Sequence, residues 1–366
     1  MGKIYSALGL MSGTSMDGVD LSIIQTDGKT KYKVILDQYF AYPNSIYNKL
    51  AVLRDKINVS KDLTKHQKKL KFVEKEITIF HAKAVNEVLK KSMISIDFIG
   101  FHGQTIFHSA KKKITKQLGD GKLLSKLTKQ KVIYDFRKND LKNGGEGAPL
   151  TPIFHKMLEN KFNIKPVSFF NIGGIVNRTT ICNDGKLSAK DVGPGMCLID
   201  KWIRINSKKK YDKNGNIAKS GKVNKKVLNE YWDKFLIFSS DKKSYDTSDF
   251  DISFFKGLSF EDGTATLTHH TANIFITLIK NNKILKIKEN LILSGGGRKN
   301  KFLVDKIRSY KKNIKLIDDY GIDGDFLESQ AFAYLAIRSY LKLPISFPNT
   351  TGCKKPCTGG IMVKNF

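Results

Sequence analysis

No apolar run in this chain is long enough to cross a membrane, although 40% of its 366 residues are hydrophobic. The N-terminus also lacks the sequence of charged region, apolar stretch and cleavage site that marks a secretory signal. Instead, the strand-like segment 4–10 leads directly into a turn of small residues. We therefore expect a cytoplasmic protein with no membrane partner.

Cysteine is scarce, and the chain has four: Cys182, Cys197, Cys353 and Cys357. So few cysteines exclude a disulfide-rich scaffold and favour reduced thiols in a reducing compartment. Cys353 and Cys357 form a lone C-x₃-C pair. A zinc site would need a second pair or histidines at ligand spacing, whereas His269 and His270 are adjacent. The sequence therefore predicts no metal site at these cysteines.

Arginine is scarce as well, because nearly all of the 64 basic residues are lysines. The net charge of +30 suggests a nucleic-acid-binding protein, which would bind with a steep dependence on salt. However, the lysines are scattered through polar positions such as 111–113 and 208–210, and arginine is the residue of bidentate base recognition. We expect no nucleic-acid partner, and a solvated basic surface that attracts anionic substrates.

Two common nucleotide-binding motifs are absent: there is no G-x-x-x-x-G-K-[ST], and no G-x-G-x-x-G opens a helix after the first strand. The segment Leu10-Met-Ser-Gly-Thr-Ser-Met-Asp-Gly-Val-Asp20 lies instead between two apolar runs. Glycine lets backbone N–H groups approach an anion, and hydroxyls add donors, so this pattern predicts a phosphate-binding turn on a β-hairpin. Asp17 beside phosphates suggests Mg²⁺ held partly through water. The alternative is an ordinary Gly/Ser hairpin turn.

The length of the chain predicts two lobes, with ligands in the cleft between them. Helical periodicity covers residues 65–91, and a strand at 96–101 follows. A second strand, glycine turn and strand over 167–181 repeats the design of the N-terminal hairpin. One such hairpin in each lobe would bind a nucleotide from opposite sides.

Two further small-residue turns extend this pattern. Residues 191–195 form a turn that we expect to open a helix over 197–205. The strand at 290–293 ends in the turn 294–300, and a helix follows. Each turn places small residues where a ligand can approach the backbone closely.

Several motifs occur in one order along nearly the whole chain. They are Met11-Ser-Gly-Thr-Ser-Met-Asp-Gly-Val-Asp20, Phe101-His-Gly-Gln-Thr105, Asp135-Phe-Arg137, Gly144-Gly-Glu-Gly-Ala-Pro149, Asn171-Ile-Gly-Gly-Ile-Val-Asn177, Asp191-Val-Gly-Pro-Gly195, Ala265-Thr-Leu-Thr268, Gly295-Gly-Gly297 and Asp325-Phe-Leu-Glu-Ser-Gln-Ala-Phe-Ala333. Each motif is weak evidence by itself, but the ordered set is specific. It resembles the anhydro-N-acetylmuramic acid kinase family.

This resemblance implies an α/β chain of the sugar-kinase and actin-like superfamily. Such a chain has two ribonuclease H-like lobes, with the nucleotide in the cleft between them. We expect the first lobe to comprise residues 1–134, completed by 346–366, and the second lobe to comprise 135–345. The resemblance also implies a homodimer.

The activity implied by the resemblance is phosphorylation of 1,6-anhydro-N-acetylmuramic acid by ATP with opening of the anhydro bridge. The product, N-acetylmuramic acid 6-phosphate, enters cell-wall recycling. Asp17 is the expected Mg²⁺ ligand. The residues expected to bind the nucleotide are Gly13, Thr14, Ser15, Met16, Asp17, Gly18, Val19 and Asp20 in the first turn, and Gly173, Gly174, Gly193, Gly195, Gly295, Gly296 and Gly297 in the others.

Asp191 matches the catalytic base of the family, and the chemistry explains why a base is needed. The 6-oxygen of an anhydro sugar is bonded to the anomeric carbon and carries no proton. Water must therefore attack the anomeric carbon, and a carboxylate at Asp191 would accept the proton of that water. The alternative for Asp191 is a structural role as a helix N-cap.

Three further residues are expected to contact the sugar. Arg137 would hold the lactyl carboxylate through its planar fork, unless Asp135 and Asp140 bind it structurally. Glu328 would bind sugar hydroxyls or help to place water; the alternative is a solvent-facing helix start with Asp325 as N-cap. His102 would hydrogen-bond the sugar or the loop backbone, and a structural histidine is the alternative.

The chain also departs from the family pattern after the expected base. The family usually has Thr at position 192 and Asn at position 196, where this chain has Val192 and Met196. The loss of two polar groups leaves two alternatives open. One is a catalytically weakened sensor of sugar and ATP with the same fold, and the other is a kinase of a different anhydro or amino sugar.

Overall fold

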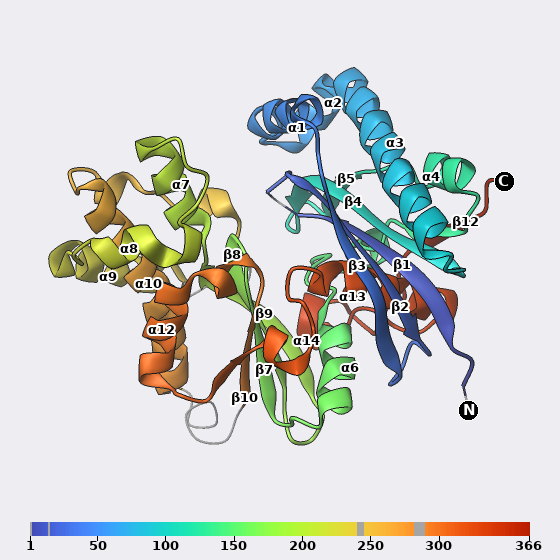
Figure 1. Cartoon of the computed structure of the whole chain (residues 1–366). Coiled ribbons are helices and arrows are strands. Elements are labelled where there is room, and N and C mark those ends of the chain that lie inside the picture. Colours follow the sequence, from blue (N-terminus) through green and yellow to red (C-terminus); the bar gives the residue numbers. More distant parts are fainter. Residues whose placement is uncertain (1, 14, 240–244, 282–289) are drawn as a thin grey trace. The chain divides into compact units, whose positions relative to one another are not determined.

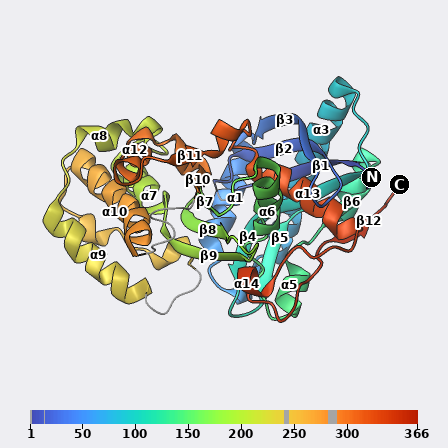
Figure 2. The ribbon, with the colours of Figure 1, turned by 90° about the horizontal axis from the view of Figure 1, so that it is seen from below.

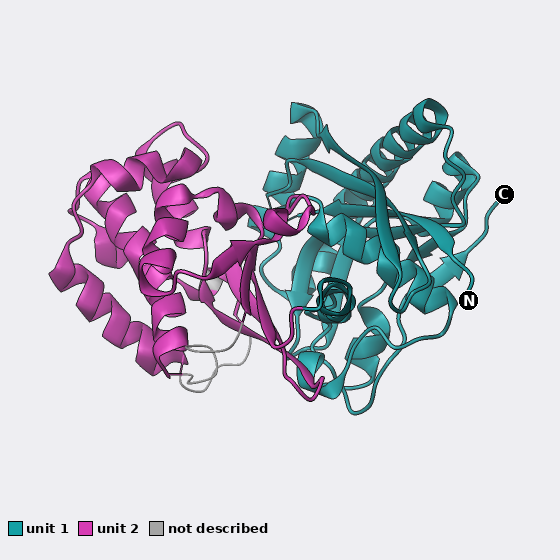
Figure 3. Ribbon diagram, turned by 60° about the horizontal axis from the view of Figure 1, so that its bottom comes forward, with its two compact units in different colours: residues 1–163, 326–366 teal, residues 164–325 magenta. Residues whose placement is uncertain are grey.

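The computed structural model describes residues 2–13, 15–239, 245–281 and 290–366. The chain forms two compact units, of which the first comprises residues 1–163 and 326–366 and the second residues 164–325 (Figure 3). These boundaries differ from those expected from the sequence, 134/135 and 345/346. Residues 326–345 belong to the first unit because helix α13 (Leu327–Tyr340) packs directly on its sheet, and α6 (Pro152–Phe162) packs on α13.

The first unit contains a seven-stranded sheet in the order β12-β6-β4-β1-β2-β3, with β5 paired to β4. Its strands are β1 (Tyr5–Ser12), β2 (Gly18–Thr26), β3 (Tyr32–Ala41), β4 (Phe98–Ser109), β5 (Ile114–Leu118), β6 (Val132–Tyr134) and β12 (Ile361–Val363). β1, β2 and β3 form an antiparallel meander, whereas β1, β4 and β6 run parallel. The C-terminal segment joins this sheet because β12 pairs with β6.

Helices cover both faces of this sheet (Figure 1). Besides α6 and α13 they are α1 (Asn44–Lys56), α2 (Ser60–Lys65), α3 (Gln67–Ser92), α4 (Gly121–Thr128), α5 (Lys138–Lys142) and α14 (Pro348–Thr351). Leu8 and Leu10 of β1 pack into a core with α1 and α3, which confirms the helix expected at 65–91. Gly9 lies between them on the opposite face, where an added Cβ would lie 1.9 Å from the Ser329 carbonyl oxygen of α13. Glycine is required there because α13 lies directly on the strand.

The second unit contains a five-stranded sheet in the order β11-β10-β7-β8-β9. The strands are β7 (Val167–Ile172), β8 (Ile175–Ile181), β9 (Leu187–Pro194), β10 (Asn290–Ser294) and β11 (Ile314–Leu316). The helices are α7 (Cys197–Asn206), α8 (Asn216–Ser220), α9 (Lys225–Ser239), α10 (Phe260–Asn281) and α12 (Lys301–Tyr310). α10 lies among the other helices (Figure 2) and contributes to two cores, one with the sheet and α12 and one with α7 and α9.

The two units share one strand topology. β7, β8 and β9 form an antiparallel meander, and β7, β10 and β11 run parallel, as β1, β2, β3, β4 and β6 do in the first unit. The order β3-β2-β1-β4-β6 therefore recurs as β9-β8-β7-β10-β11. This duplication confirms the expected α/β fold with two ribonuclease H-like lobes of the actin-like type.

One local expectation was wrong. The segment from Asp191 to Pro194 is not a turn, because it forms the end of β9 and pairs with β8. The helix expected after it is present as α7, and its N-cap is Met196, so Asp191 does not cap it. Over the described ranges, none of the helices has the length and apolar character needed to span a membrane.

A buried histidine in α10 gives the fold a testable pH dependence. His270 is fully buried among the rings of Tyr231, Trp232 and Phe235, at centroid distances of 4.7, 5.5 and 5.3 Å. Neither of its ring nitrogens has a hydrogen-bond partner among the described residues. Burial lowers the pKa of His270 from 6.5 to about 3, because the charged imidazolium would lose its hydration.

We predict that His270→Phe reduces the loss of stability on acidification. Between pH 6.5 and 3 the unfolded chain binds a proton at this position and the folded chain does not, so stability falls as the pH falls through this window. The free energy of unfolding should therefore drop by about 2 kcal/mol less in His270→Phe than in wild type between pH 7 and pH 5. Urea titrations at both pH values measure this difference, and equal drops would contradict it.

Candidate active site

The turn between β1 and β2 carries the expected phosphate-binding residues of the first unit. The Met16 N–H donates to the Gly13 carbonyl at 3.1 Å, and Met16 has a φ of 58°. A Cβ at Gly18 would lie 2.4 Å from the Phe40 carbonyl oxygen, whereas a Cβ at Gly13 would meet only the Ser15 hydroxyl, at 3.7 Å. Gly18 is therefore required by internal packing, and Gly13 has open space beside it. Thr14 lies outside the described residues.

A buried hydrogen-bond chain supports the strand that enters this turn. His81 Nδ1 lies 2.8 Å from the Ile77 carbonyl oxygen, which can only accept, so Nδ1 carries the proton. His81 Nε2 therefore accepts from the Ser12 hydroxyl at 3.3 Å, and the Ser12 oxygen accepts from the Tyr42 hydroxyl at 2.9 Å. Burial lowers the pKa of His81 to about 4, which keeps this arrangement at neutral pH. Gln104 adds a bond from its Nε2 to the Gly13 carbonyl at 2.9 Å.

The side chains of the turn divide into buried and exposed groups. Met16 and Val19 belong to the hydrophobic core of the unit, so a nucleotide can meet only their main chain. Ser15 and Asp17 are exposed, and the Ser15 hydroxyl donates to Asp17 Oδ1 at 2.6 Å. Asp20 follows on β2, opposite Met11 of β1. Asp17 therefore presents a carboxylate next to the backbone of the turn.

The three expected sugar-binding residues lie together in the first unit. Arg137 donates from Nε and Nη2 to His102 Nε2, at 3.1 and 2.9 Å, and from Nη1 to the Gly147 carbonyl at 2.8 Å. Asp135 pairs with Lys138, which speaks against the alternative that Asp135 binds Arg137 structurally. Burial lowers the pKa of Arg137 to about 10, and the charges of Glu328 and Asp140 oppose this shift. The guanidinium is thus held in one orientation near Glu328.

The protonation of His102 follows from its contacts. Its Nδ1 lies 2.8 Å from the Gly103 carbonyl oxygen and must donate, so Nε2 is the acceptor for Arg137. Burial and the Arg137 charge both hold the pKa of His102 well below its usual range. The ring stacks on Phe332 of α13 at a centroid distance of 4.5 Å. His102 therefore stays neutral and positions Arg137.

Glu328 lies in the first turn of α13 and is half-buried. Burial raises the pKa of its carboxyl, and the positive charge of Arg137 counteracts this effect. The alternative for this helix, a start capped by Asp325, is wrong, because Phe326 occupies the N-cap position. Asp325 instead accepts from Arg298 Nη1 at 2.7 Å within the second unit.

Backbone hydrogen bonds join the glycine turn 173–174 of the second unit to the residues that follow β9. The Gly195 N–H donates to the Gly174 carbonyl and the Met196 N–H to the Gly173 carbonyl, each at 2.9 Å. A Cβ at Gly195 would lie 2.3 Å from the Gly173 carbonyl oxygen, whereas a Cβ at Gly173 would meet its nearest atom only at 3.5 Å. Gly193 has a φ of 150° and packs against Ile274. The β7–β8 turn is thus fastened to the end of β9.

Asp191 lies on β9 opposite Asn177 of β8 and is half-buried. Its Oδ2 accepts the backbone N–H of Tyr245 at 3.0 Å, which orients the carboxylate. Val192 and Met196 pack against both hydrophobic cores of this unit. Val192 and Met196 are therefore part of the core, and the Asp191 carboxylate keeps its bond to Tyr245.

The third glycine turn follows β10. Gly295 has a φ of 77°, and a Cβ there would lie 2.2 Å from Asn171 Oδ1. A Cβ at Gly297 would lie 2.2 Å from Ile172, whereas Gly296 has nothing within 4 Å. Arg298 anchors the turn because its guanidinium is buried and pairs with Asp318 and Asp325. The main chain at Gly296 is thus the part of this turn that is open to a ligand.

Several residues that hold the expected site residues in position could not be identified from the sequence. Gly147 and Gln104 lie inside motifs that the resemblance used, but only the fold shows their bonds to Arg137 and to the phosphate turn. Tyr245 acts through its backbone, so its side chain carries no signal. His81 lies inside a helical pattern that looks like any other buried face.

The model of the anhydro-N-acetylmuramic acid kinase family matches residues 5–365. The chain belongs to this family. It is 53% identical over 377 residues to the anhydro-N-acetylmuramic acid kinase of Pelagibacter ubique and 36% identical over 375 residues to that of Brucella canis, with full coverage of both chains in each case. Membership of the anhydro-N-acetylmuramic acid kinase family makes it an ATP-dependent kinase that acts on a small sugar.

Among solved structures, the chain is similar to component A of (R)-2-hydroxyglutaryl-CoA dehydratase from Acidaminococcus fermentans. The TM-score is 0.44 at 14% identity, covering 91% of this chain and 99% of the other. The duplicated strand order, and not this similarity, defines the fold of this anhydro-N-acetylmuramic acid kinase family member.

We predict that His102→Ala weakens sugar binding selectively. Without the Nε2 acceptor, Arg137 loses its fixed orientation, and a lost bond to a charged group costs about 1.5–3 kcal/mol. The KM for the sugar should rise at least about tenfold, while the KM for ATP stays within about twofold. His102→Gln retains a carbonyl acceptor and should recover part of the loss. Initial rates with each substrate varied in turn test this prediction, and equal effects on both KM values would contradict it.

Proposed function

We propose that the chain opens the anhydro bridge of 1,6-anhydro-N-acetylmuramic acid and phosphorylates its 6-oxygen from ATP, with Asp191 as the general base. The observation that carries this proposal is the Asp191 carboxylate at the end of β9. The Tyr245 N–H orients it, and the glycine turn 173–174 is hydrogen-bonded to the same strand end. A carboxylate held in this way can accept a proton without first reorganising.

The proposed reaction balances with water as the third reactant. The oxygen of water bonds to the anomeric carbon while the bond from that carbon to the 6-oxygen breaks. The 6-oxygen takes the γ-phosphoryl group, and ADP leaves. Asp191 accepts the proton that the attacking water loses, and the 6-oxygen keeps the electron pair of the broken bond and uses it to bond to the γ-phosphorus. Asp191 then releases its proton to solvent. The product is N-acetylmuramic acid 6-phosphate.

The nucleotide in this proposal is bound mainly by backbone groups. The main chain around Gly13 and Gly296 faces open space, whereas Met16 and Val19 have buried side chains. Asp17 and the Ser15 hydroxyl offer oxygen atoms at the surface of the turn. They fit Mg²⁺, which takes few protein ligands and keeps water and phosphate oxygens in its shell. Bound Mg²⁺ would supply charge neutralisation for the phosphates.

Arg137 and Glu328 are the proposed sugar contacts. Arg137 donates three of its five N–H groups to His102 and Gly147. One N–H group on each terminal nitrogen remains for a carboxylate. These two N–H groups can donate to the oxygens of a lactyl carboxylate. Glu328, close enough to Arg137 to influence its pKa, would bind sugar hydroxyls or the attacking water.

We predict that Asp191→Asn abolishes most of the turnover. The variant keeps the shape of the side chain but cannot accept a proton, so kcat should fall by about 10²–10⁴-fold. Mass spectrometry of the reaction with sugar, Mg²⁺ and ATP should show an ATP-dependent 6-phosphate product from wild type.

The matched control is Asp184→Asn, on the β8–β9 turn of the same unit, whose carboxylate pairs with Lys186 at the surface. This control should retain wild-type turnover. Wild-type kcat in Asp191→Asn would overturn the assignment of the base. A folded wild-type protein that binds ATP but gives no product would overturn the assigned sugar.

A further inference from the structure

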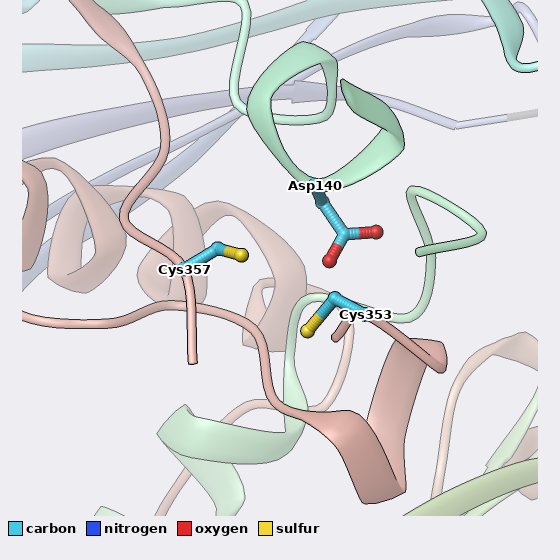
Figure 4. A group of neighbouring side chains, drawn as sticks. All are labelled: Asp140, Cys353 and Cys357. Atoms are coloured by element: carbon cyan, nitrogen blue, oxygen red, sulfur yellow. The ribbon is translucent and has the colours of Figure 1, made fainter. Parts of the chain in front are cut away.

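Two cysteines and one aspartate from distant parts of the chain meet inside the first unit. Figure 4 shows Asp140 on α5, and Cys353 and Cys357 on the C-terminal segment that follows α14. One carboxylate oxygen and the two sulfurs all lie within 4.8 Å of one another. None of the three residues is more than 4% exposed. Within the part of the chain that the structure describes, no other three His, Cys, Asp or Glu residues meet this ligand spacing.

We propose that Cys353, Cys357 and Asp140 bind a thiophilic divalent cation such as Zn²⁺. Two thiolates and one carboxylate are ligand types that zinc uses, and the C-x₃-C spacing lies within the range of zinc sites. The sequence predicted no metal site at these two cysteines, because the third ligand lies more than 200 residues earlier in the chain. Both cysteines are free thiols in the structure.

The carboxylate of Asp140 is already oriented by the protein. Oδ2 accepts the Gly147 N–H, and Oδ1 accepts the Thr351 hydroxyl, each at 2.6 Å. Each oxygen keeps a second lone pair for a cation. Hydrogen bonds of this kind hold a ligating carboxylate in metal sites and tune its affinity.

The backbone that carries the cysteines is also held in place. Cys357 exchanges backbone hydrogen bonds with Ser346, at 3.0 and 3.2 Å, and its carbonyl also accepts the Ile345 N–H at 2.8 Å. Next to Cys353, the Lys354 N–H donates to the Asn143 carbonyl at 3.0 Å, one turn beyond Asp140. The three ligands are therefore brought together by the fold before any cation arrives, which reduces the entropy cost of binding.

Binding changes the protonation of the thiols. The Cys357 thiol donates to the Lys355 carbonyl at 3.0 Å, so it carries its proton in the free protein. When the cation forms two metal–sulfur bonds and one metal–oxygen bond, the two thiol protons pass to solvent. Water completes a four-coordinate shell, as in zinc sites with three protein ligands.

The cation site is connected to the expected sugar contact by two hydrogen bonds. Asp140 Oδ2 holds the Gly147 N–H, and the Gly147 carbonyl accepts from Arg137 Nη1. A cation on Asp140 would thus stabilise the loop that orients Arg137, and it would tie this loop to the C-terminal segment. The proposed effect of the cation is to hold this loop, and with it Arg137, in one orientation.

Titration with Co²⁺ tests the proposal, because cobalt replaces zinc and its thiolate complexes absorb in the near ultraviolet. The full chain is reduced, treated with a chelator, separated from it and titrated without oxygen. We expect one Co²⁺ per chain with a thiolate band, and Zn²⁺ should displace it. The double variant Cys353→Ala/Cys357→Val keeps small apolar groups in the buried positions and should bind at least about 100-fold more weakly.

The control variant is Cys182→Ser, which changes an exposed cysteine of the second unit and should bind Co²⁺ as wild type does. Thermal unfolding of each variant without metal shows whether it is folded. The absence of a thiolate band in reduced wild type would overturn the proposal without reference to any variant. A band that persists in the folded double variant, or that is lost in Cys182→Ser, would overturn it as well.

Discussion

The buried carboxylate of Asp140 binds two other segments of the first unit. It accepts the Gly147 N–H of the glycine loop and the Thr351 hydroxyl of α14. Gly147 in turn holds Arg137 through its carbonyl, and an added Cβ at Gly145 would lie 2.1 Å from the carboxylate. Because a buried donor left without a partner costs about 1–3 kcal/mol, loss of this carboxylate would free the loop, α14 and Arg137 together.

The same strand order in both units explains why the expected nucleotide-binding turns resemble one another. In each unit the first strand of the meander lies at the centre of the sheet, flanked by a parallel strand and an antiparallel one. Its C-terminal end leads to a glycine, Gly13 in one unit and the pair 173–174 in the other. Buried packing fixes the turns through Gly18 and Gly195, while Gly13 and Gly173 have space beside them. Each lobe therefore combines a rigid strand end with an approachable backbone.

Much of the fold could be predicted from the sequence, because hydrophobic periodicity and glycine turns are local signals. The helix at 67–92 and the two hairpins follow directly from them. The secondary structure at Asp191 could not be predicted, since Gly193 and Pro194 suggest a turn although they pair within β9. The unit boundaries could not be predicted either, because only the packing of α13 on the first sheet shows that residues 326–345 belong to the first unit.

The candidate site was predictable in its residues but not in its connections. The motifs identified Arg137, His102 and Glu328 separately, and the fold brings them together. The neutral state of His102 and the orientation of Arg137 depend on carbonyl oxygens whose positions no residue type encodes. The cluster of Cys353, Cys357 and Asp140 could not be predicted for the same reason. The spacing of the two cysteines does not indicate that Asp140 lies beside them.

In the proposed reaction, water opens the anhydro bridge while the original bridge oxygen receives the phosphoryl group. A short reaction in H₂¹⁸O, analysed immediately by tandem mass spectrometry, tests this order of bond formation directly. We expect one ¹⁸O in the sugar at the anomeric position and none in the transferred phosphate. An unlabelled sugar phosphate would contradict attack by water at the anomeric carbon. ¹⁸O in phosphate with the anhydro sugar unchanged would contradict the coupled reaction, because it would show that water hydrolyses ATP without ring opening.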